Sequence, residues 1–316
     1  MSHDAHIVVV GSFAVGLTMK TDRFPSAGET VLGSGYRTDH GGKGSNQAVG
    51  CARLGAKVSL VARIGKDPFG EMALRLYSEE GVDATGVRQM AERPTGVGFI
   101  LVKLGSGENC IALDPGANDL LADSDVAESD PVLASADVVL TQLEIPARAA
   151  EAAMAHGRAH GAITVLNPAP ARPLQPAVLQ NVEILTPNEA EAKVLLGHRP
   201  DAGIDASQLA RELLRIGPRN VVVTLGGQGA FIATRTWEKE VPAIKVPAVD
   251  TTGAGDAFNA GLAVGLAHGA DLEAAVNLAV ITGGLAVTKD GVVPALPWWG
   301  EVLAYCERCG LPKPMC

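Results

Sequence analysis

The chain has 316 residues, with 26 Lys and Arg against 35 Asp and Glu, a net charge of -9 and 47% apolar residues. This length and apolar content predict a globular protein that buries a large core without disulfide or metal support. The acidic balance argues against DNA, RNA or an anionic membrane as the main partner, because those surfaces need clustered Lys and Arg. A local pocket for one small anion is compatible with it.

The start of the chain and its cysteines bear on its location. Met1 to His6 is polar, and no apolar stretch reaches the roughly 18 residues of a membrane span, so we expect a cytoplasmic protein. Five cysteines, an odd number, fit reduced thiols better than a disulfide framework. Cys306 and Cys309 have the C-x-x-C spacing of zinc knuckles, and Cys316 would add a third sulfur. Since no second pair supplies a fourth ligand, the sequence favours free thiols.

Short β-branched runs alternate with longer Ala- and Leu-rich segments, a pattern typical of a parallel sheet flanked by helices. The expected strands are 6–10, 58–62, 137–141, 163–166, 182–185 and 221–225. The expected helices are 45–54, 70–80, 146–160, 189–196 and 206–216. No linker, charge run or internal repeat divides the chain, which predicts a single α/β domain over residues 1–316.

Two segments, about 13–38 and 95–112, break this rhythm. Both alternate apolar with polar residues around turns such as Pro25 to Gly28 and Gly105 to Gly107. We interpret them as antiparallel strands outside the main sheet that form a β lid over its carboxyl edge. An ordinary edge hairpin is the alternative.

The most informative motif runs from Asp250 to Asp256 and reads Asp-Thr-Thr-Gly-Ala-Gly-Asp. Gly253, Ala254 and Gly255 allow a tight turn that exposes backbone N–H groups, and a helix is expected to begin at about Asp256. Such a helix N-terminus favours anions. A carboxylate beside a bound phosphate would accept the proton of an attacking hydroxyl, although a plain helix cap with turn glycines is the alternative.

A second glycine-rich stretch, His40 to Gln47, opens another expected helix. Lys43 and Asn46 offer donors to sugar hydroxyls or phosphate oxygens. The stretch is not a Walker A loop, because Arg37 stands where that motif needs glycine. A solvated loop is the alternative.

Three further polar pieces follow expected strands, where open α/β sheets bind ligands. Asn188 and Glu191 open one helix, the loop from Thr224 to Gly229 follows another strand, and Glu144 ends a third. Each taken alone is compatible with a turn or a cap.

His156 and His160 lie four residues apart on an expected helix, the spacing of a two-histidine metal face. No third ligand is evident in the sequence, so a solvated helix surface is the favoured interpretation.

In this order and spacing, the segments resemble the ribokinase-like, or PfkB, family of sugar and nucleoside kinases, and within it the ribokinases. The resemblance is carried by Val8 to Ser12, Gly41 to Gln47, Gln142 to Glu144, Asn167 to Ala171, Thr186 to Glu189, Thr224 to Gly226 and Asp250 to Asp256. It implies a three-layer α/β/α sandwich with a nine-stranded, mostly parallel sheet and a small β lid. It also implies transfer of the γ-phosphoryl group of ATP to a sugar hydroxymethyl group.

The resemblance assigns roles to residues. Asp256 would be the catalytic base, and the N–H groups of Gly253, Ala254, Gly255 and Asp256 would form an anion hole. The sugar site would include Gly42, Lys43, Asn46, Glu144 and Asp256. The nucleotide site would include Asn188, Glu191, Thr224, Gly226, Gly227, Gly229 and Gly255. Glu191 would also help to organise Mg²⁺ through water.

A potassium site and a homodimer formed through the lid are implied as well. The cation would be held by Asp250 and by carbonyl groups of Thr252, Ala286, Lys289 and Gly291. Ala295 stands where ribokinases carry a Ser hydroxyl, which weakens the inference of potassium dependence.

The larger departure is at the start of the lid, where Ala14 and Gly16 replace an Asn and an Asp that grip sugar hydroxyls in ribokinases. Losing two such groups should lower the affinity for ribose. We therefore expect a kinase of a small sugar, with a nucleoside or a keto-deoxy sugar acid as alternative substrates. A non-catalytic sugar-binding regulatory protein on the same fold is the alternative from outside the enzymes.

Overall fold

The main sheet is the organising element of the computed structural model, which describes residues 5–199 and 201–314. Among these residues, nine strands pair in the order β13-β12-β11-β10-β9-β8-β1-β4-β5. In the order given, all neighbouring pairs from β11 to β5 are parallel. The pairs β11–β12 and β12–β13 are antiparallel. The strands are β1 His6–Val10, β4 Lys57–Gly65, β5 Asp83–Met90, β8 Val138–Thr141, β9 Ile163–Leu166, β10 Ile184–Leu185, β11 Asn220–Thr224, β12 Gly229–Ala233 and β13 Glu238–Pro242.

Helices cover both faces of this sheet. Strand β1 shows why, since Ile7 and Val9 point into one apolar core and Val8 and Val10 into the other. The first core is closed by α1 Lys43–Arg53, α2 Pro68–Glu80, α9 Ala254–Ala267, α10 Leu272–Ala286 and α11 Trp299–Cys309. The second is closed by α3 Asp123–Glu128, α4 Asp130–Leu133, α5 Ala147–Ala159, α6 Pro176–Gln180, α7 Glu189–Leu195 and α8 Ala206–Arg215. The expected three-layer α/β/α fold is confirmed.

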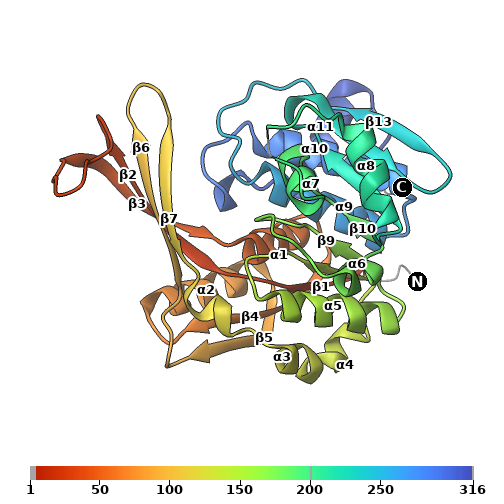
Figure 1. The fold of residues 1–316 in the computed structure, drawn as a ribbon, viewed down its shortest axis with the longest axis horizontal. Helices are drawn as coiled ribbons and strands as arrows, with labels where there is room; N and C mark the ends of the chain where they lie inside the picture. The colour runs from red at the N-terminus through yellow and green to blue at the C-terminus, as the bar shows by residue number, and fades with distance from the viewer. Residues whose placement is uncertain (1–4, 200, 315–316) are drawn as a thin grey trace.

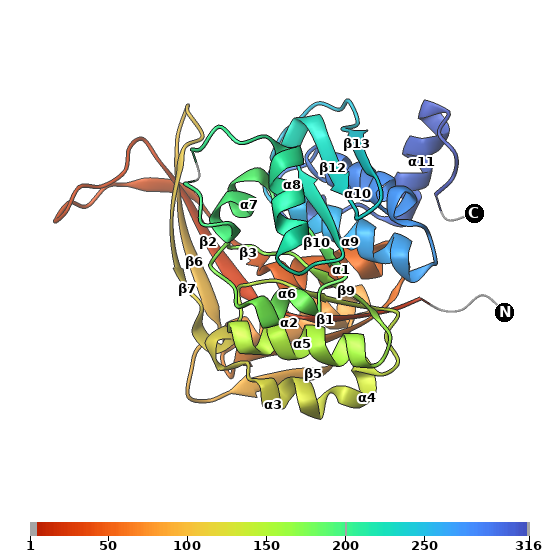
Figure 2. The ribbon, with the colours of Figure 1, turned by 45° about the vertical axis from the view of Figure 1, so that its right-hand side comes forward.

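The lid is a separate sheet of four strands in the order β3-β2-β6-β7, within the described part of the chain. It extends away from the helices and the main sheet (Figure 1), and the turned view of Figure 2 shows the same separation. Its strands are β2 Ala14–Thr21, β3 Gly33–Gly41, β6 Gly96–Lys103 and β7 Asn109–Asp114.

One expectation for the lid is wrong, because β2 and β6 pair in parallel rather than antiparallel. The reason is the route of the chain. Each of these strands directly follows a strand of the parallel main sheet, β2 after β1 and β6 after β5, so both leave the same edge in the same direction. The pairs β2–β3 and β6–β7 are antiparallel, as expected.

All six expected strands and all five expected helices form, with ends shifted by a few residues. The strands β5, β12 and β13 had no counterpart in the prediction. Strands β5 and β13 are the two edges of the sheet, and their mostly polar, exposed residues lack an alternating apolar pattern. None of the described helices is both long and apolar enough to cross a membrane.

The two cysteines of the C-x-x-C pair lie on α11, where Cys306 is buried and Cys309 is exposed, and both are free thiols. Cys316 lies outside the described residues.

Candidate active site

Asp256 lies at the carboxyl edge of the main sheet, in the first turn of α9, and is only 5% exposed. The helix begins at Ala254, two residues earlier than expected, because Gly253 caps it in the left-handed conformation with φ 79°. Asp256 therefore does not cap the helix. Instead its Oδ2 accepts a hydrogen bond from Asn46 Nδ2 at 2.8 Å and its Oδ1 accepts one from Gln47 Nε2 at 2.9 Å.

A second layer of amide side chains holds Gln47 in place. Gln47 Nε2 also donates to Asn167 Oδ1 at 3.2 Å, and Gln142 Nε2 donates to Gln47 Oε1 at 2.5 Å. Asn167 in turn donates to the carbonyl oxygen of Thr186 at 3.0 Å. Sequence reasoning assigned no role to Gln47, Gln142 or Asn167. The sequence pointed to them only because all three are amide residues within the motifs that carry the family resemblance.

The first turn of α9 is held by side-chain hydrogen bonds, and the space next to Gly255 is open. Asn259 Nδ2 donates to the Gly255 carbonyl oxygen at 2.8 Å, and Thr186 Oγ1 donates to Asn259 Oδ1 at 2.6 Å. A Cβ on Gly255 would meet no atom within 4 Å. The Ala254 N–H donates to the Thr251 carbonyl oxygen at 3.3 Å. The other N–H groups of a first helical turn have no acceptor within the helix. This end of α9 can receive an anion.

The glycine-lysine motif begins α1 beside Asp256. Gly42 has φ 86°, and a Cβ there would lie 2.6 Å from Phe13 Cα, so the turn requires glycine. Glu144 Oε2 accepts hydrogen bonds from Ser12 Oγ at 2.6 Å and from the Lys43 N–H at 2.8 Å. Asn46 Oδ1 is buried and has no partner within the described part of the chain.

The charged side chains of the site change one another's pKa values. Burial disfavours the charge of Lys43, but the carboxylates of Asp256, Glu144 and Glu191 outweigh this effect and raise the pKa of Lys43. Burial also raises the pKa of Glu191, and the negative charge of Asp256 acts in the same direction. One cation thus faces three carboxyl groups.

The expected nucleotide residues lie around the start of α7. Asn188 and Glu191 form a capping box, in which Asn188 Oδ1 accepts from the Glu191 N–H and Glu191 Oε2 accepts from the Asn188 N–H, both at 2.8 Å. Asn188 also forms a bridge with Thr224. These two residues therefore cap α7, and within the described part of the chain the Asn188 amide nitrogen donates no recorded hydrogen bond.

The three glycines of the following loop differ in what surrounds them. Gly226 and Gly227 are exposed, and a Cβ on either would meet no atom within 4 Å. Gly229 is buried at the start of β12, where a Cβ would clash with the backbone of Val241 and Ala243 in and after β13. Packing between strands accounts for glycine at position 229.

The expected cation residues come together where two loops meet. Asp250 accepts hydrogen bonds from the Thr252 N–H at 2.9 Å and from the Gly291 N–H at 3.2 Å. Burial opposes the charge of Asp250, but these hydrogen bonds outweigh it and lower the pKa of its carboxyl group. Ala286 accepts a hydrogen bond from the Lys289 N–H at 3.3 Å, and the Lys289 side chain turns to Glu301 at 2.6 Å.

The lid residues Ala14 and Gly16 begin β2. Gly16 pairs with Asp39 of β3, and a Cβ on Gly16 would lie 3.9 Å from the Asp39 Cβ. Arg37 binds Asp39 at 2.8 Å and Asp290 at 3.0 Å, which joins the lid to the loop of the expected cation site.

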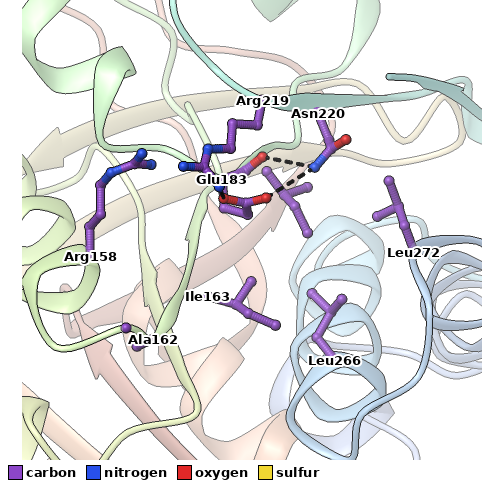
Figure 3. Close-up of a pocket in the computed structure, with 10 residues that line it drawn as sticks. Arg158, Ala162, Ile163, Glu183, Arg219, Asn220, Leu266 and Leu272 are labelled. Atoms are coloured by element: carbon purple, nitrogen blue, oxygen red, sulfur yellow. Dashed lines mark hydrogen bonds and ion pairs between the residues drawn. The ribbon is translucent and has the colours of Figure 1, made fainter. Parts of the chain in front are cut away.

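A separate pocket of about 490 Å³ lies at the other edge of the sheet (Figure 3). It is lined by residues at the amino ends of β9, β10 and β11, together with Arg158 and Arg219. None of the site residues expected from the sequence lines it. Ligands of open α/β sheets bind at the carboxyl ends of the strands, so this pocket is not the active site.

Comparison with known proteins identifies the family. The sequence profile of the pfkB family carbohydrate kinases matches residues 4–299. A ribokinase of Haemophilus influenzae is 35% identical over 302 residues, which cover 96% of this chain and 98% of that protein. A deoxyribokinase of Salmonella typhi is also 35% identical, over 95% of this chain and 99% of that protein. The structure of Arabidopsis thaliana ribokinase complexed with ribose and ATP matches with a TM-score of 0.88 at 29% identity, covering 96% of this chain and 98% of that one. This chain therefore belongs to the pfkB family and is an ATP-dependent carbohydrate kinase.

Proposed function

We propose that the protein phosphorylates the hydroxymethyl group of a small neutral sugar, with Asp256 as the base. The observation that carries this proposal is the position of Asp256, buried in the first turn of α9 and held by Asn46 and Gln47. A base beside an open helix N-terminus can take the proton of a hydroxyl group while the helix binds the phosphoryl group being transferred.

The chain divides the work of catalysis between side chains and backbone. Asn46 and Gln47 orient the Asp256 carboxylate, and the free Asn46 Oδ1 accepts a hydrogen bond from the sugar. The first-turn N–H groups of α9 stabilise negative charge as the phosphoryl group moves. Asn259 keeps that turn in position through the Gly255 carbonyl. Glu144 and Lys43, at the start of α1, bind further hydroxyl groups of the sugar.

Two cations fit the donor sets of this site. Glu191 provides a carboxyl group next to Asp256 and Lys43, which suits a water-bridged Mg²⁺. Bound Mg²⁺ neutralises triphosphate charge. We also propose that K⁺ is bound by Asp250 with carbonyl groups of Thr252, Ala286, Lys289 and Gly291, and that it supports the anion hole. The N–H contacts of Asp250 already hold these two loops together.

The charge of the site favours a neutral sugar over a sugar acid. Three carboxyl groups, those of Asp256, Glu144 and Glu191, act electrostatically on the single cation Lys43, so these side chains bring more acidic than basic groups to the site before any ligand binds. A carboxylate on the substrate would add to that repulsion.

The arginines of the lid are also already paired. Arg23 binds Glu29, and Arg37 binds Asp39 and Asp290. They therefore offer no free cation to a sugar acid, which argues against the keto-deoxy sugar acid alternative.

We further propose that the lid pairs with a second copy to form a homodimer. Its strands carry exposed apolar side chains, among them Phe99, Ile111 and Leu113. Its outer strands β3 and β7 are open edges that can pair or pack against another sheet.

The test is ADP formation in a coupled assay over ribose, deoxyribose, neutral hexoses, nucleosides and keto-deoxy sugar acids, with and without K⁺. We expect neutral sugars to be phosphorylated fastest, with ribose not among the best because Ala14 and Gly16 remove two of its partners. Asp256→Asn should lower kcat by about 10²–10⁴-fold while sugar binding, followed by calorimetry, persists. Near-normal turnover of Asp256→Asn would overturn the mechanism. Sugar binding by the parent protein with no ADP formation on any sugar would favour the regulatory alternative.

A further inference from the structure

A cluster of two histidines and an aspartate lies far from the kinase site. His156 and His160 are at the carboxyl end of α5, and Asp130 is the first residue of α4. Asp130 Oδ1 lies 2.6 Å from His156 Nδ1 and 2.8 Å from His160 Nε2. Helix α5 runs from the carboxyl end of β8 to the amino end of β9, so the cluster lies at the edge of the sheet opposite Asp256. Nothing in the proposed phosphoryl transfer uses it.

Asp130 is a third potential ligand that the sequence did not reveal. The expectation that His156 and His160 form a plain solvated surface is therefore incomplete. The three potential ligand atoms all lie within 4.8 Å of one another. Two imidazole nitrogens and one carboxylate oxygen are a donor set of Zn²⁺ and similar transition metals, whereas Mg²⁺ and Ca²⁺ prefer oxygen ligands.

The backbone holds the ligands in register. The N–H of His160 bonds to the His156 carbonyl oxygen at 3.1 Å, which fixes the two rings one helical turn apart. Helix α4 is anchored by Leu133, which is fully buried in the second core. Both elements that carry ligands are thus attached to the body of the protein.

The geometry needs only a small adjustment to accept a metal. Zn²⁺ binds nitrogen and oxygen at about 2.0–2.2 Å, so ligand atoms in a tetrahedral site lie about 3.3–3.5 Å apart. The carboxylate of Asp130 has to withdraw by less than about 1 Å from its present contacts, and the two imidazole nitrogens, which lie within 4.8 Å of each other, have to approach by up to about 1.5 Å. The side chains of Asp130, His156 and His160 are 40%, 33% and 32% exposed, which leaves them room to move and leaves space for water as a further ligand.

We propose that Asp130, His156 and His160 bind one Zn²⁺-class divalent ion that joins α4 to α5. The ion takes the place of the hydrogen bonds that the imidazoles now make to Asp130. It is distinct from the Mg²⁺ and K⁺ of the kinase site, and the proposal does not depend on the sugar that is phosphorylated.

The experiment is titration of the tag-free, chelator-treated protein with Zn²⁺ in excess Mg²⁺, followed by calorimetry. Absorption of the Co²⁺-loaded protein in the visible range reports the coordination geometry. The variants are His160→Gln and Asp130→Asn. His198→Gln is the matched control, because His198 also contacts a single carboxylate, Glu212, at 3.1 Å but belongs to no group of three potential ligands among the described residues.

We expect the parent and His198→Gln to bind one equivalent of Zn²⁺ and to melt at a higher temperature when it is bound. His160→Gln and Asp130→Asn should each lower the affinity at least about tenfold and lose this thermal shift. A parent that binds no Zn²⁺ at micromolar concentration would overturn the proposal. So would unchanged binding in His160→Gln and Asp130→Asn, since the ion would then lie elsewhere.

Discussion

At the scale of single residues, the Asp39 carboxylate, which is paired with Arg37 at 2.8 Å, lies beside the space where Gly16 has no side chain. The two residues oppose each other across β2 and β3, and opposed residues of an antiparallel pair share one face of the sheet. The Cβ that Gly16 lacks would lie 3.9 Å from the Asp39 Cβ. We therefore expect a sugar bound on that face of the lid to contact Asp39.

We predict that Asp39→Ala raises KM for the best sugar about ten- to a hundredfold and changes kcat little. The reason is that a hydrogen bond to a charged group contributes about 1.5–3 kcal/mol. The measurement is steady-state kinetics with saturating ATP. Asp22→Ala, which removes an exposed carboxylate of the lid, is the control and should leave KM unchanged. An unaltered KM in Asp39→Ala would remove Asp39 from the sugar site.

The sequence identified part of the site residue by residue. The expected place of Asp256 at the start of a helix followed from the glycines that precede it, because that pattern is local; its role as a base stays a prediction. The roles of Gln47 and Asn167 did not follow, since their contacts join residues that are 209 and 120 positions apart. Asp130 was missed as the partner of His156 for the same reason, and only the packing of α4 against α5 reveals it.

At the scale of elements, the N-terminus of α9 depends on a backbone conformation that only glycine adopts without strain. Gly253 has φ 79°, and a Cβ there would lie 2.6 Å from Val292 Cγ1. A residue other than glycine costs about 1–2 kcal/mol in this left-handed conformation, in addition to the clash. Relief of both would tilt the first turn, and with it the N–H groups that we propose to bind the phosphoryl group.

We predict that Gly253→Ala lowers kcat about a hundredfold, in the range seen when one oxyanion donor is lost. Gly269→Ala is the matched control, because Gly269 has φ 82° just past the other end of α9 and a Cβ there would meet no atom within 4 Å. Both variants should lose stability from backbone strain in thermal melts, Gly253→Ala more than Gly269→Ala because of its clash with Val292, but Gly269→Ala should keep normal kcat. Equal kcat in the two variants would mean that the geometry of this turn does not limit catalysis.

The sequence predicted the elements of the inner sheet better than those at its borders. Strands such as β1 and β8 are buried on both faces and are apolar almost throughout, a pattern that is visible locally. Strands β5 and β13 lie at the edges, where half-exposed polar residues are compatible with loops. The parallel pairing of β2 with β6 depends on where each strand leaves the main sheet, which no local pattern records.

At the scale of the whole molecule, the lid leaves apolar surface uncovered. Ile111 and Leu113 lie two residues apart on β7, on one face of an edge strand, and are 57% and 54% exposed. Their register partners on β6 are Ile100 and Gly98. Gly98 adds no side chain beside Leu113, so the face is flat and apolar there. A second lid packed on this face would bury these side chains, each contributing about 1.5–3 kcal/mol when fully covered.

We therefore predict that the protein is a dimer at micromolar concentration and that Ile111→Lys/Leu113→Lys converts it to a monomer, because two buried charges would oppose the contact. Ile216→Lys is the control, since Ile216 is also exposed but follows α8, outside the lid. Sedimentation velocity of the three proteins measures the outcome. The double variant should raise the dimer dissociation constant at least about a hundredfold, and the control should not change it.

A parent that sediments as a monomer, or a double variant that remains dimeric, would show that the lid is not the dimer interface. In either case the apolar face of β7 would need another explanation.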